Sequence, residues 1–144
     1  MRKRTSVMPQ SGRWCVLVSC LFAVAGCSSQ PTAPLTPVMI QSLQDVDGRW
    51  EGMVWAIQGG NARRVTVILT NHDTFATYAF AGMSSESSFL GTGRLQLERG
   101  RLLTVGESRT LTFTLATRGA VRMLMVDGVG KDGKSYHAEL SPAR

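Results

Sequence analysis

The sequence lacks an apolar run long enough to cross a membrane as a helix. Its longest largely apolar stretch, residues 15–25, has eleven residues. Such a stretch would rise only about 16 Å as a helix, against a hydrocarbon core of roughly 30 Å. No acidic residue precedes Asp45, whereas Arg2, Lys3, Arg4 and Arg13 precede the stretch. A basic head followed by a short apolar segment is typical of a secretory signal peptide.

Cysteine is scarce, and two of the three cysteines, Cys15 and Cys20, lie in this apolar stretch. Cleavage of the signal would leave Cys27 alone in the mature chain. The mature chain would then have no intrachain disulfide and no thiolate metal site, and it would rely on a packed core for its stability.

The segment around Cys27, Val24-Ala25-Gly26-Cys27, resembles the lipobox of bacterial lipoproteins, with small residues at Ala25 and Gly26 before the cut. The resemblance implies diacylglyceryl transfer to the Cys27 thiol, cleavage before Cys27, and acylation, for example with palmitate, of the new amino group. Two or more acyl chains hold a protein stably on a bilayer. The residue after the cysteine is Ser28 and not the aspartate typical of inner-membrane retention, which implies an outer-membrane anchor facing the periplasm. The alternative is an ordinary secretory signal cut after Ala25.

Removing the first 26 of the 144 residues leaves 118, enough for one small domain and a tether. Four of the 16 basic residues and none of the 10 acidic residues leave, so the formal net charge falls from +6 to +2. This near-neutral charge argues against a nucleic-acid partner. We expect a cleaved signal at 1–26, a lipidated and proline-containing tether at 27–44 that is extended over 28–40, and a folded domain at 45–144. A short helical turn is expected at 40–45.

The folded domain reads as β-structure throughout, because short alternating apolar and polar runs lie between turn residues. Eight strands are predicted, and every link between them is too short for a crossover helix, so neighbours should pair antiparallel. Such a meander can close into a small barrel, which removes exposed edges; a two-sheet β-sandwich is the alternative. The predicted strands are 48–57, 63–70, 74–80, 89–98, 101–105, 109–116, 120–126 and 134–140.

Gly48-Arg49-Trp50 at the start of the first strand is similar to the Gly-x-Trp motif that opens lipocalins. The resemblance implies an eight-stranded barrel whose closed end is plugged by Trp50. It also implies a late basic residue against the plug, either Arg118 or Arg122. The chain departs from the family in lacking its Thr-Asp-Tyr motif.

Four aromatic residues are the candidates for ligand binding: Trp50, Trp55, Tyr78 and Tyr136. Core packing is the competing interpretation for each of them. The two histidines, His72 and His137, are better explained as turn and strand residues than as metal ligands. The carboxylates are expected to pair with arginines. The sequence therefore predicts no catalytic residue, metal or cofactor.

These features predict a non-enzymatic binding or accessory module whose ligand is a lipid or another hydrophobic small molecule. The alternative is a protein–protein role, in envelope assembly or in the inhibition of a cell-wall hydrolase. A hollow barrel favours a ligand, whereas a filled barrel with an exposed apolar patch favours a protein partner.

Overall fold

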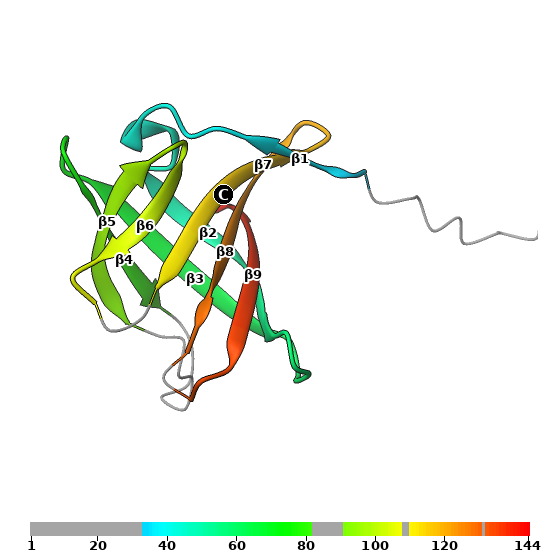
Figure 1. Cartoon of the computed structure of the whole chain (residues 1–144). Helices are drawn as coiled ribbons and strands as arrows, with labels where there is room; N and C mark the ends of the chain where they lie inside the picture. Colours follow the sequence, from blue (N-terminus) through cyan, green and yellow to red (C-terminus); the bar gives the residue numbers. More distant parts are fainter. Residues whose placement is uncertain (1–32, 82–90, 108–109, 131) are drawn as a thin grey trace, which may run out of the picture. The chain divides into compact units, whose positions relative to one another are not determined.

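The computed structural model of the chain describes residues 33–81, 91–107, 110–130 and 132–144. Within these ranges the fold is all-β, with nine strands and one short 3₁₀ turn (Figure 1). The elements are β1 (Leu35–Val38), η1 (Leu43–Asp45), β2 (Gly48–Ala56), β3 (Arg63–Asn71), β4 (Ala76–Ala81), β5 (Thr92–Glu98), β6 (Arg101–Val105), β7 (Leu111–Arg118), β8 (Val121–Val129) and β9 (Ser135–Pro142).

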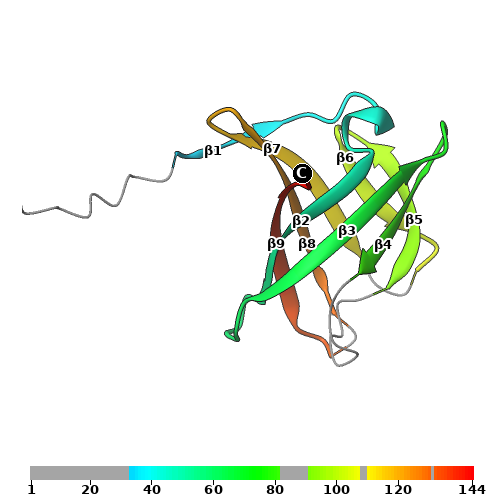
Figure 2. The same cartoon turned by 180° about the vertical axis from the view of Figure 1, so that it is seen from behind.

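Strands β2 to β9 form a closed antiparallel barrel. Each pairs with the next along the chain, and β9 returns to pair with β2 from Trp50↔Pro142 to Ala56↔Tyr136. The two opposite views show the strands wrapping around a single interior (Figures 1 and 2). The predicted eight-stranded meander is thus confirmed, and the architecture is the barrel and not the sandwich.

Two of the predicted hairpin turns depend on backbone conformations that few residues adopt. Arg99 and Gly100 connect β5 to β6 with φ of 51° and 80°, the positive values that a tight two-residue hairpin requires. In the turn from β7 to β8, Gly119 adopts a positive φ of 61°. Asp132 and Gly133 lie within a five-residue link, 130–134, between β8 and β9.

The barrel interior is filled by the apolar residues that alternate along the strands. Leu111 and Phe113 on β7, for example, are fully buried, as the alternation of that segment predicts. The large side chains with almost no exposed surface come from strands β3 to β9 and from Val46, the residue that follows η1. They are Tyr78, Phe113, Leu69, Leu95, Leu102, Leu111, Leu124, Leu140, Val46, Val67 and Val126.

One end of the barrel is closed by η1 and Trp50. The indole Nε1–H of Trp50, which is 3% exposed, donates to the carbonyl of Val46, at 2.8 Å. Arg122 donates to the carbonyl of Asp45, whereas Arg118 points outward and pairs with Glu139. Of the two basic residues that the lipocalin resemblance left open, Arg122 is therefore the one that holds the closing segment. The predicted helical turn at 40–45 corresponds to η1.

Part of the segment expected as an extended tether forms a strand, β1, that pairs with the barrel strand β7. β1 pairs with the last part of β7, from Leu35↔Arg118 to Val38↔Leu115. That edge of β7 is available because β6 pairs with β7 only through Leu102 and Leu103. Prolines are compatible with such an edge strand because the missing N–H can face solvent. The described chain is therefore attached to the barrel from residue 35 onward, earlier than the sequence indicates.

Leu35 also explains why β1 docks there. It packs against three side chains of the barrel's outer face, Ala116, Met123 and Met125, which are buried although they point away from the interior. This small outer cluster gives β1 an apolar contact in addition to its backbone pairing.

Barrel closure also depends on a glycine. A Cβ at Gly52 would lie 1.9 Å from the carbonyl oxygen of Glu139 on β9. A glycine in a strand commonly marks such a close backbone approach. Gly52 therefore permits β2 and β9 to meet.

The hydrogen bonds to Asp45 at the closed end of the barrel predict that the free energy of unfolding depends on pH. The backbone N–H groups of Ser42 and Gln41 both donate to Asp45, at 2.9 Å, and together they hold the pKa of Asp45 below its ordinary value of 3.8. A lowered folded-state pKa adds stability above the ordinary value, and this stability is lost as the pH falls through the lowered value. Asp45→Asn should therefore lower the free energy of unfolding at neutral pH, and its difference from the parent should shrink between about pH 5 and about pH 2.

Urea unfolding across this pH range measures the difference. Asp73→Asn, a change of equal charge in the β3–β4 turn, is the matched control for the loss of one surface carboxylate. If the free energies of unfolding of Asp45→Asn and the parent differ by the same amount at every pH, the predicted contribution of Asp45 is contradicted.

Candidate functional site

Two of the four aromatic candidates belong to the core. Trp50 and Tyr78 are only 3% and 1% exposed. The hydroxyl of Tyr78 donates to the carboxylate of Glu107 at 2.8 Å, and the Trp50 indole is bonded to Val46 as described above. Both side chains are therefore used in packing and in internal hydrogen bonds.

A glycine makes the Tyr78–Glu107 contact possible. Gly93 lies opposite Tyr78 on β5, and a Cβ at Gly93 would fall 1.6 Å from a carboxylate oxygen of Glu107. The role of Gly93 is to leave room for Glu107, which follows β6, to reach across β5 to the tyrosine.

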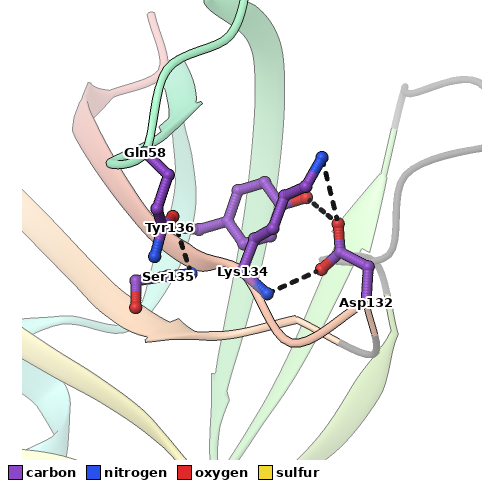
Figure 3. Close-up of polar contacts among 5 residues, drawn as sticks. All are labelled: Gln58, Asp132, Lys134, Ser135 and Tyr136. Carbon is purple, nitrogen blue, oxygen red and sulfur yellow. Dashed lines mark hydrogen bonds and ion pairs between the residues drawn. The ribbon is translucent and has the colours of Figure 1, made fainter.

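Tyr136 lies at the barrel end opposite η1, where it is held by the link between β8 and β9 (Figure 3). Its hydroxyl donates to Asp132 Oδ2 at 2.7 Å, and the backbone N–H of Lys134 donates to Asp132 Oδ1 at 3.2 Å. The ammonium of Lys134 is 4.0 Å from the same carboxylate. Asp132 thus fixes both the conformation of the link and the position of the tyrosine ring.

The neighbouring link, between β2 and β3, is fastened to the same place. Gln58 Oε1 accepts from the N–H of Ser135 at 3.1 Å (Figure 3), and the N–H of Ile57 donates to the carbonyl of Ser135 at 2.8 Å. These bonds hold the end of β2 against β9 and so fix the residues that precede Gln58.

Those preceding residues form an exposed apolar row on the outer wall of the barrel. Met53, Trp55 and Ile57 occupy alternate outward positions, and we name them the β2 stripe. Met53 is 38% and Ile57 62% exposed, and Trp55 is partly exposed. Solvent-facing positions of a strand are normally polar, so an apolar row there is a candidate for contact with another molecule.

Trp55 is braced from the side. Its ring meets that of His137 edge-on, with centroids 5.0 Å apart. Nδ1 of His137 lies 2.6 Å from the carboxylate of Asp127. The three residues stand side by side on β2, β9 and β8, because Trp55 pairs with His137 and His137 with Asp127. The indole is therefore held in place by contacts within the chain.

The other polar candidates have structural partners. Arg49 pairs with Glu51 at 2.6 Å and Arg118 with Glu139 at 2.9 Å, the arginine–carboxylate pairing that the sequence predicted. Nε2 of His72 lies 3.2 Å from the hydroxyl of Thr77. In the described ranges no three His, Cys, Asp or Glu side chains gather to hold a metal ion.

The lipidation and cleavage residues, Cys27, Ala25 and Gly26, lie outside the described residues. Among the residues that are described, no helix has the length and apolar character needed to traverse a bilayer.

Searches of known protein families, of curated proteins and of solved structures find no match to this chain.

The two tyrosine–carboxylate pairs predict unequal effects of removing the same hydroxyl. Tyr78→Phe should lower the free energy of unfolding by about 2 kcal/mol, since a buried donor to a charged acceptor is lost. Tyr136→Phe should cost under about 1 kcal/mol because its bond is exposed to water. Urea unfolding at neutral pH measures both, and equal losses would contradict the different burial of the two pairs.

Proposed function

We propose that this protein is an outer-membrane lipoprotein, anchored through acyl chains on Cys27, that acts as a non-enzymatic binding module for another protein of the cell envelope. Envelope assembly factors and cell-wall hydrolases are the partner classes that the sequence predicts. The β2 stripe is the proposed contact surface.

The attachment point supports an orientation for the anchored molecule. Leu35 follows Cys27 by eight positions, a reach of at most about 28 Å. β1 lies beside the turn that follows Arg118, at the barrel end closed by η1. A short tether at this end holds the closed end nearer the bilayer, and the opposite end, with Trp55 and Ile57, is then directed away from the membrane.

The observation that carries the choice of a protein partner is the contrast between the tryptophans. Trp50 is buried in a filled core, whereas Trp55 is partly exposed on the outer wall and braced by His137. Tryptophan is enriched among the few residues that dominate protein–protein binding energy. A side chain that is already fixed in its bound position also loses less entropy on binding.

The lipid anchor is tested with the parent chain and a Cys27→Ala variant. Intact-mass measurement of the exported parent should give a mature protein that begins at Cys27 and carries diacylglyceryl and N-acyl groups. The variant should lose these groups and its place in the outer-membrane fraction. An unmodified Cys27 in the exported parent would overturn the anchor.

The contact surface is tested by photo-crosslinking in intact cells. A photoreactive residue in place of Trp55 should give one discrete adduct with an envelope protein. The same residue at Glu98, exposed at the end of β5 and outside the β2 stripe, is the matched control and should give none. Adducts of equal yield at both positions would contradict the proposal that the β2 stripe is the contact surface.

The competing ligand hypothesis is tested by titrating the detergent-solubilised protein with a fluorescent fatty acid. Saturable uptake, together with the absence of an adduct at position 55, would favour a hydrophobic small molecule over a protein partner. If the experiments show no adduct and no fatty-acid uptake, both the protein-partner and the small-molecule forms of the proposal are overturned.

A further inference from the structure

Arg94 occupies an unusual position on the outer wall, away from the β2 stripe. It points outward from β5, opposite Thr77 on β4 and Val105 on β6. Its guanidinium carbon lies 4.0 Å from the centroid of the Phe75 ring. A contact of this kind holds the cation over the ring without using its hydrogen-bond donors.

The Phe75 ring is itself held in place. It stacks with the ring of His72, with centroids 4.8 Å apart and planes inclined by 19°. The second ring nitrogen of His72, Nε2, is 3.2 Å from the hydroxyl of Thr77. A series of contacts therefore runs from Thr77 through His72 and Phe75 to Arg94, and it fixes the guanidinium on the surface.

Arg94 differs from the paired arginines in its lack of an acidic partner. Arg49 and Arg118 each contact a carboxylate. Within the described ranges Arg94 makes no ion pair and no hydrogen bond. All five of its N–H donors are thus free for a ligand.

Arg94 also separates two shallow depressions, and it lines both. One, of about 320 Å³, is bordered by Ile68 and by the hydroxyl-bearing Thr70, Thr77 and Thr92. The other, of about 230 Å³, is bordered by Thr74, Phe75, Gln96 and Val105. No carboxylate lines either depression. Hydroxyl and amide donors beside an unpaired guanidinium suit a negatively charged oxygen group, which arginine can bind through two parallel hydrogen bonds.

We propose that Arg94, with Thr77 and Gln96, forms a binding site for a carboxylate or phosphate group of a ligand. The depressions on both sides leave room for the part of the ligand next to that group. The apolar side chains of Ile68 and Val105 and the threonine hydroxyls would contact this part. The site stands on a different face from the β2 stripe and does not depend on the partner proposed there.

The test is a titration of the ¹⁵N-labelled full chain, purified in detergent, with acetate and separately with inorganic phosphate. Sodium chloride at matched ionic strength is the reference. Saturable shifts should appear at Arg94 Nε and at the Thr77 and Gln96 amides with at least one of the two anions. A preference for acetate identifies a carboxylate-bearing ligand, and a preference for phosphate a phosphate-bearing one.

Three variants separate a fixed site from general surface charge. Arg94→Gln should weaken binding at least tenfold. Phe75→Leu should weaken it severalfold while keeping the charge, because the guanidinium is no longer held. Arg64→Gln, which removes an exposed arginine of β3 that has no aromatic contact, should leave binding unchanged. Shifts that do not saturate, or that are equal in Arg94→Gln and the parent, would overturn the proposal.

Discussion

The structure depends on the pairing of its last strand with the first strand of the ring. The β2–β9 ladder turns an open sheet into a barrel, and an open sheet would leave unpaired backbone groups at its edges. Gly52 allows β9 to come close to β2, and Trp50 and η1 close the end at which β2 begins. The inward positions of all eight strands then share one core.

A filled interior places the candidate functions on the outside of the barrel. Because Trp50 and Tyr78 are part of the core, the remaining candidates are exposed residues that strand pairing places side by side on the outer wall. The β2–β9–β8 face combines the apolar stripe with the His137–Asp127 pair. The β4–β5 face combines an aromatic ring with an unpaired cation. The same scaffold thus carries two surfaces of different chemistry.

Local sequence patterns predict much of this fold. The candidate sites depend instead on how neighbouring strands are aligned, because that alignment brings together residues far apart in the sequence. The alternation of Leu111 and Phe113 and the Arg99-Gly100 turn are local signals, and they predict the strands and the barrel. β1 escaped prediction because its prolines resemble those of a solvated linker, and its partner lies about eighty residues away at Leu115–Arg118. The contact between Phe75 and Arg94 joins residues nineteen positions apart and requires the β4–β5 alignment. Aromatic identity alone could not separate the buried Tyr78 from the partly exposed Trp55.

The docking of β1 has a mechanical consequence for a chain anchored at Cys27. Tension on the anchor loads the four-residue ladder between β1 and β7 before it loads the ring of strands. Detachment of this segment would extend the reach from about 28 Å to about 45 Å, since Ile40 follows Cys27 by thirteen positions. The barrel itself would stay shut. In a chain anchored at Cys27, detachment of β1 would therefore lengthen the tether while the ring of strands stays paired.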